Sequence, residues 1–84
     1  MPTLRQHFGK RLRSIRKGRG LTQEEFAELV GISVDFLSLI ERGINAPSFE
    51  VLEEMARKLR MPVRELFDFR TAKTRADLDA RFNP

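Results

Sequence analysis

The sequence contains no cysteine and a single histidine among its 84 residues. Without cysteine the chain can form neither a disulfide framework nor a thiolate metal site, and His7 alone cannot build a histidine-rich zinc site. The chain also lacks the apolar run of about 18 residues that a membrane-spanning helix needs, and its N-terminus lacks an apolar signal core. We therefore expect a soluble, cytoplasmic protein with no metal and no other cofactor.

The groups that catalysis requires are also missing. The sequence shows no pairing of a nucleophile with a general base, no phosphate-binding loop and no constellation of metal ligands. We therefore expect a protein that acts by binding and is not an enzyme. Its length is typical of one domain with a single modest core.

Charge is distributed unevenly along the chain. Residues 1–20 contain seven lysines and arginines and no acid, whereas residues 21–41 contain five acids and no base. The formal net charge of the whole chain is +4. A basic patch attracts phosphates, so this distribution favours a nucleic-acid partner, with a solvated basic face as the alternative.

Apolar spacing and capping residues predict five short helices. Thr3 with Gln6 and Thr22 with Glu25 each fit a capping box, in which two side chains satisfy backbone N–H groups at a helix start. The five helices are expected to begin near Thr3, Thr22, Ser33, Ser48 and Pro62. Because no strand pattern is present, we predict a compact all-α, five-helix domain over residues 1–68. Residues 69–84 would form a C-terminal tail or short helix.

Residues 23–42 have the spacing of two helices that cross steeply at a short turn. Ala27 provides a small side chain at the crossing point, and Gly31 can adopt the positive φ that the turn requires. The inward face would consist of Phe26, Val30, Ile32, Leu37 and Ile40. The outward face of the second of these helices would then consist of Ser33, Val34, Asp35, Ser38, Leu39 and Arg42.

This pattern resembles the helix-turn-helix of the lambda repressor/Cro-like family, also called the XRE family. The residues that carry the resemblance are "LTQEEFAELVGIS", "LIERG", the "NAPS" turn and "LEEMARKLRMPVRELF", and it covers roughly residues 4–67. It implies a sequence-specific DNA-binding transcriptional regulator with a lambda repressor-like fold. We expect a repressor that places the helix at about 33–42 in the major groove of double-stranded DNA, where base edges are distinguishable.

The resemblance also implies roles for individual residues. Gln23 matches a glutamine that contacts a phosphate at the positive end of a helix dipole. Arg16 and Glu41 match an ion pair that ties the first helix to the third, which at a surface would contribute only about 0–1 kcal/mol. The expected phosphate contacts are Thr22, Gln23, Arg42 and Asn45, and the expected base-facing residues are Ser33, Val34, Asp35, Ser38 and Leu39.

The base-facing set lacks arginine, lysine, glutamine and asparagine, the usual readers of base edges. One interpretation is a DNA reader with modest direct readout, which the basic first helix and Arg42 hold on the backbone. The alternative is a protein-interaction adaptor, or an antitoxin-like partner of another protein, with Val34, Phe36 and Leu39 as its contact surface. Phe36 distinguishes the two, because it either packs into the core or faces a partner. We favour the DNA reader.

Apolar residues near the end of the domain predict a homodimer surface, because little core is left for them to join. Family members often bind palindromic sites as homodimers with half-sites about 34 Å apart. For Phe67, completion of the core is the alternative. The predicted dimer residues are Met61, Val63, Phe67 and Phe69, to which Leu78 and Phe82 could add.

Overall fold

The computed structural model describes residues 1–70, which form five α-helices and no strand. The helices are α1 (Leu4–Gly18), α2 (Gln23–Val30), α3 (Val34–Glu41), α4 (Phe49–Leu59) and α5 (Val63–Leu66). The predicted all-α, five-helix fold is therefore confirmed. The predicted tail or short helix, including Leu78 and Phe82, lies outside the described residues except for Phe69 and Arg70.

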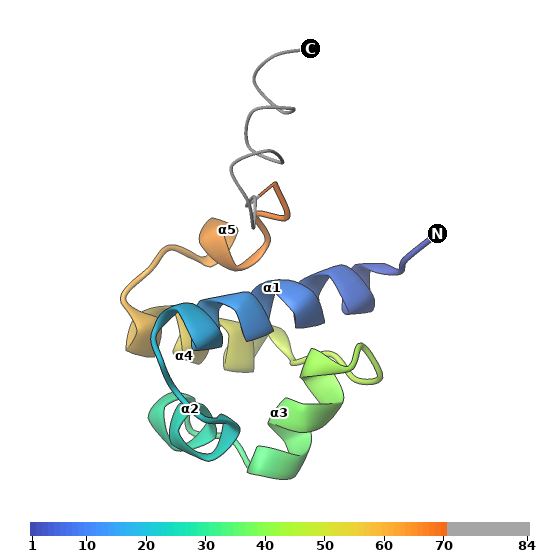
Figure 1. Ribbon diagram of the computed structural model, residues 1–84. Coiled ribbons are helices and arrows are strands. Elements are labelled where there is room, and N and C mark those ends of the chain that lie inside the picture. The colour runs from blue at the N-terminus through green and yellow to red at the C-terminus, as the bar shows by residue number, and fades with distance from the viewer. Residues whose placement is uncertain (71–84) are drawn as a thin grey trace.

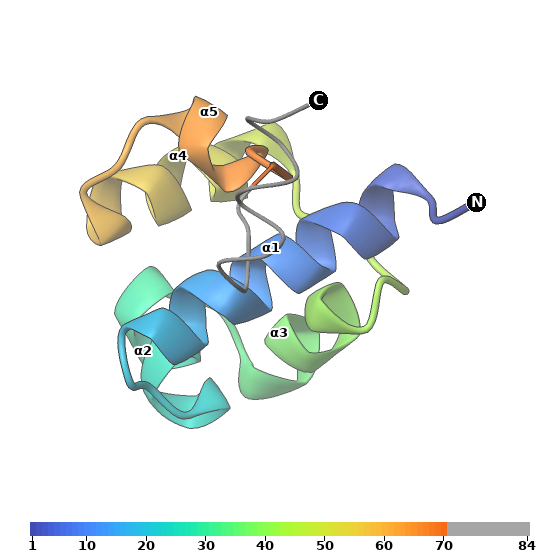
Figure 2. The same cartoon turned by 45° about the horizontal axis from the view of Figure 1, so that its top comes forward.

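The five helices pack around one core, and each has its main contacts with two of the others. The main contacts of α1 are with α3 and α5, those of α2 are with α3 and α4, and α4 also contacts α5. α1 therefore crosses the middle of the molecule, with α2 and α3 on one side and α5 on the other (Figure 1). The turned view shows α3 lying alongside α1 (Figure 2). None of the helices within residues 1–70 is long and apolar enough to cross a bilayer.

The helices begin where the capping residues predicted. Thr3 and Thr22 each form a complete capping box. Ser33 and Ser48 cap α3 and α4, since each hydroxyl accepts a hydrogen bond from the backbone N–H three residues later. Pro62 precedes α5 without a side-chain cap. The helix starts are thus set by hydrogen bonds between residues close together in the chain.

The core takes apolar side chains from all five helices. Ala27 is 3% exposed where α2 packs, and Gly31 ends α2 with a φ of 80°, so both residues have the roles that the spacing predicted. Met61 and Phe67 pack, partly buried, against the edge of this core. The buried residues are Phe8, Leu12, Ile15, Phe26, Ala27, Val30, Leu37, Ile40, Leu52, Met55, Ala56, Leu59 and Leu66.

Candidate nucleic-acid interface

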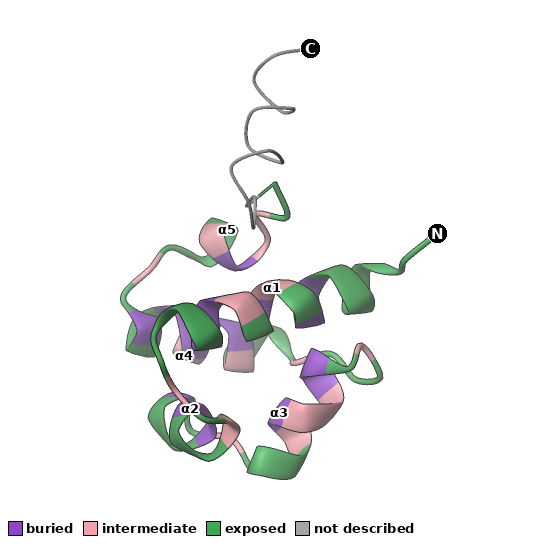
Figure 3. Cartoon of the chain, viewed as in Figure 1, coloured by how far each residue is buried: buried purple, intermediate pink, exposed green. Residues whose placement is uncertain are grey.

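α3 has one buried face and one exposed face. Leu37 and Ile40 are fully buried and hold the helix against the core, together with Glu41. The opposite side is open to solvent, and the first turn of the helix is its most exposed part (Figure 3). The helix therefore lies at the surface of the domain, as insertion into a DNA groove requires.

The five predicted base-facing residues lie together on α3 but differ in exposure. Ser33, Val34 and Asp35 are exposed, whereas Ser38 and Leu39 are half-buried. The hydroxyl of Ser33 accepts a hydrogen bond of 3.0 Å from the backbone N–H of Phe36, which leaves its own proton free to donate. The surface of this helix thus offers short hydrogen-bonding groups and two aliphatic side chains.

Phe36 does not belong to that outward surface. Its side chain is partly buried and packs against the core. The alternative interpretation, a protein-interaction adaptor, needs Phe36 beside Val34 and Leu39 as an apolar patch. Without Phe36 the patch consists only of Val34, which is 36% exposed, and Leu39, which is half-buried. The packing of Phe36 thus favours the DNA reader over the adaptor.

Arg16 and Glu41 form an ion pair between α1 and α3, and the pair is buried. The Nε of Arg16 lies 2.7 Å from Oε2 of Glu41, and its Nη2 lies 3.1 Å from Oε1. The two side chains are only 11% and 3% exposed. The expectation of a surface pair that contributes little to stability was therefore wrong. In a buried pair, the free-energy cost of desolvating both charges and their attraction to each other are both large. Hydrogen bonding to Glu41 raises the pKa of Arg16 although burial opposes this, so the guanidinium stays charged.

Gln23 is tied to the same carboxylate. Its Nε2 donates a hydrogen bond of 3.0 Å to Oε1 of Glu41. Glu41 therefore joins the ends of three helices, through Arg16 of α1 and Gln23 of α2. An amide nitrogen carries two protons, so the side chain of Gln23 keeps a second donor while the first is held in place. No local spacing rule connects residues 18 positions apart, so the sequence did not indicate this bond.

The predicted phosphate contacts gather around the C-terminal end of α3. Gln23 touches Glu41 directly, and Thr22 precedes Gln23 in the chain. Arg42 and Asn45 follow Glu41, and both are exposed. The only hydrogen bond of the Arg42 side chain within residues 1–70 is a long one, 3.4 Å from its Nε to the carbonyl oxygen of Ser38. Its guanidinium is therefore largely available to an external anion.

Comparison with known proteins decides the family. A family model described as helix-turn-helix, HTH_3, matches residues 12–66. The chain belongs to the helix-turn-helix family. This is the XRE-type family of DNA-binding transcriptional regulators, so the resemblance drawn from the sequence is confirmed and the DNA partner follows from it.

Several helix-turn-helix relatives show how far the similarity extends. YazB of Bacillus subtilis, an uncharacterized HTH-type transcriptional regulator, is 44% identical over 59 residues, which are 70% of this chain and 86% of YazB. Antitoxin PezA of Streptococcus pneumoniae is 43% identical over 51 residues, 61% of this chain and 32% of PezA. The transcriptional repressor RstR of a Vibrio cholerae cryptic phage is 32% identical over 59 residues, 70% of this chain and 53% of RstR.

A solved helix-turn-helix structure has the same architecture. The restriction-modification controller protein C.AhdI from Aeromonas hydrophila is 36% identical and superposes with a TM-score of 0.70. The match covers 75% of this chain and 96% of that one. The five-helix arrangement of this chain is therefore that of a known regulator.

The basic residues of this helix-turn-helix protein are used partly within the fold. Arg11 of α1 and Arg19, which directly follows α1, donate hydrogen bonds of 2.9 and 2.6 Å to the backbone carbonyls of Glu65 and Leu59, near the ends of α5 and α4. Carbonyl groups at helix C-termini lack intrahelical partners and carry partial negative charge, so arginine satisfies them well. Arg5 likewise donates to the carbonyl of Ile44 at 3.2 Å. These three arginines are therefore engaged within the fold, and the expectation that the basic first helix holds the DNA backbone stays a prediction for the basic residues without such bonds.

The predicted dimer residues divide into two groups. Met61 and Phe67 pack against the core, and the ring of Phe67 lies 5.0 Å from that of Phe8, so core completion accounts for them. Val63 and Phe69 are 41% and 37% exposed. A further apolar residue, to which the sequence pattern assigned no role, is Phe49, which is 82% exposed at the start of α4.

Proposed function

We propose that the chain is a repressor that reads operator DNA with α3 in the major groove. The single observation that carries the proposal is the exposed face of α3, which is anchored at its C-terminal end by the buried Arg16–Glu41 pair and the partly buried bond from Gln23 to Glu41. Rigid support of a reading helix matters because a displacement of about 1 Å is enough to break hydrogen bonds to base edges. The similarity to RstR supports repression as the outcome.

The chemistry of α3 suggests how it would read bases. Ser33 and Ser38 can donate or accept at short range, and Asp35 can accept from the amino group of cytosine. Val34 and Leu39 would contact thymine methyl groups. Because none of these side chains is long, α3 would have to lie deep in the groove, where the shape of the DNA adds to specificity.

Phosphate contacts would hold the helix in that position. We propose that Gln23, with its amide oriented by Glu41, donates to one phosphate and that Thr22 lies beside it at the start of α2. Arg42 and Asn45 would contact the backbone after α3. We propose that the protein acts in the cytoplasm, as a DNA partner would require. The adaptor alternative has the similarity to PezA in its favour but lacks the apolar surface that it needs.

A salt titration tests the DNA proposal. We expect the logarithm of the binding constant for a selected duplex to fall with the logarithm of salt concentration by about 0.9 per phosphate contacted.

Gln23→Ala should weaken binding to all duplexes alike, because it removes a phosphate contact. Ser38→Ala should instead change the order of preferred sequences. Fluorescence anisotropy on purified protein would measure both effects.

The outcomes of that titration are separable. Binding that does not respond to salt would contradict DNA docking altogether. Unchanged sequence preference in both Ser38→Ala and Asp35→Ala would leave DNA binding intact but overturn the placement of α3 in the groove. Glu28→Gln, a neutralisation at an exposed position of α2, serves as a control for general effects of charge on the titration.

We further propose that the protein acts as a homodimer through the end of its domain over residues 1–68, with residues 69–84 as an extension that adds to the interface. The exposed Val63 and Phe69 support this surface. Phe69→Ser should shift the sedimentation coefficient toward that of a monomer, because it replaces apolar contact area with a hydroxyl. Phe49→Ser is the matched comparison. If Phe49→Ser produces the monomer and Phe69→Ser does not, the dimer surface lies at α4 instead.

A further inference from the structure

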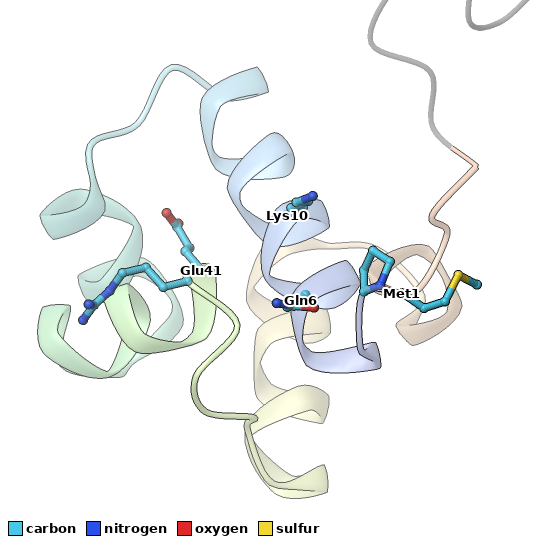
Figure 4. A pocket seen from close by; sticks show the side chains of 6 residues that line it. Met1, Gln6, Lys10 and Glu41 are labelled. Carbon is cyan, nitrogen blue, oxygen red and sulfur yellow. The ribbon is translucent and has the colours of Figure 1, made fainter.

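A pocket of about 400 Å³ lies between the N-terminal half of α1 and the C-terminal end of α3. Gln6 and Lys10 of α1 form one wall, and Glu41 with Arg42 forms the other (Figure 4). Met1 and Pro2 complete the lining. The pocket thus adjoins the region where the predicted phosphate contacts gather, and Lys10 comes from the basic first helix, for which no individual phosphate-binding residue was named.

The charge of this pocket is positive. Lys10 is exposed and makes no hydrogen bond or ion pair with any residue in the described range 1–70. The guanidinium of Arg42 has only its long bond to Ser38. The one acid, Glu41, is compensated, because both of its oxygens accept hydrogen bonds from Arg16 and one also accepts from Gln23. Lys10 and Arg42 therefore both line the pocket, and neither forms an ion pair within residues 1–70.

The walls of the pocket are held at a fixed distance. An added Cβ on Gly43 would lie 2.7 Å from Cγ of Gln6, so the turn after α3 is in tight contact with α1. Arg5 also ties α1 to that turn through the carbonyl of Ile44. Because the backbone of the two walls is already fixed, binding in the pocket would order only the side chains that line it.

We infer that this pocket binds a phosphodiester group of duplex DNA, held between the ammonium group of Lys10 and the guanidinium of Arg42. The inference rests on the proposed function, since DNA on α3 would place its backbone past Arg42. It names Lys10 as the residue through which the basic first helix contacts the DNA backbone. Arg5, Arg11, Arg16 and Arg19 bind acceptors within the fold, whereas Lys10 has none there.

The test compares two lysines. Lys10→Ala and Lys58→Ala each remove one positive charge from an exposed helical lysine, but Lys58 lies on α4, away from the pocket, where its charge acts on Glu54. Salt titrations with a selected duplex would measure the slope for each. We expect Lys10→Ala to make the slope shallower by about 0.9. The loss of affinity relative to the unaltered protein should then be about eightfold larger at 0.1 M salt than at 1 M salt. Lys58→Ala should leave the slope unchanged, and Lys10→Arg should restore it.

Each result has one meaning. If the two alanine variants have equal slopes while the unaltered protein binds duplex in a salt-dependent way, the pocket is not a phosphate site and the DNA function stands. If the unaltered protein itself shows no salt-dependent binding, the proposed function fails. A change in the order of preferred sequences in Lys10→Ala would also overturn the inference, because a phosphate contact carries no sequence information.

Discussion

Gly9→Ala is expected to lower the free energy of unfolding by about 3 kcal/mol, at the upper end of the cost of overpacking. Gly9 is buried in α1 where that helix crosses α3. An added Cβ would collide with the carbonyl oxygen of Ile40 and lie 2.8 Å from that of Glu41. Both obstacles are backbone atoms, which cannot rotate away as a flexible side chain can. The two helices would have to separate, and the Arg16–Glu41 pair would be stretched with them.

Gly18→Ala is the matched control because it makes the same change in the same helix. An added Cβ on Gly18 meets nothing within 4 Å. Alanine is a better helix former than glycine by up to about 1 kcal/mol, so this variant should be neutral or slightly more stable. Urea unfolding followed by circular dichroism would measure both. A Gly9→Ala protein as stable as Gly18→Ala would show that α1 and α3 do not approach this closely.

The contrast between these two glycines shows what the sequence could predict. Helix starts were predictable, because a capping box such as that of Thr22 and Glu25 joins residues three apart. The crossing of α2 and α3 was predictable from Ala27 and Gly31, because these residues also lie close together in the chain. Gly9 gave no such signal. A glycine within a helical pattern has the same sequence context whether it faces solvent or the backbone of another helix.

In the candidate site, too, some features follow from local sequence and others depend on how the helices pack. Helical periodicity predicted which side of α3 would face outward, and the structure leaves Ser33, Val34 and Asp35 exposed there. The burial of Arg16 and the hydrogen bond from Gln23 to Glu41 depend on how three helices meet in space. So do the bonds of Arg11 and Arg19 to carbonyls near the ends of α5 and α4. Charge counts along the chain cannot separate such internal uses from binding to an external phosphate.

Glu41→Ala is expected to lower the free energy of unfolding by roughly 3 kcal/mol, because it leaves the guanidinium of Arg16 buried without its carboxylate. That guanidinium keeps only its 2.9 Å bond to the carbonyl of Leu21. High salt should not reproduce this loss, since buried charges are screened weakly. Glu54→Ala breaks an exposed ion pair with Arg57 and should leave stability almost unchanged. Urea unfolding at low and high salt would compare the two.

A second variant separates stability from orientation. Replacing a buried ion pair with apolar residues of similar volume is often neutral or stabilising, so the double variant Arg16→Met with Glu41→Leu should regain most of the lost stability. It cannot restore the acceptor that holds the amide of Gln23. Its affinity for duplex DNA should therefore stay about tenfold below that of the unaltered protein, the effect of losing a hydrogen bond to a charged group. Full recovery of affinity together with stability would show that Glu41 serves the fold alone. Recovery of stability without affinity would mean that the pair positions a phosphate-binding side chain on α2.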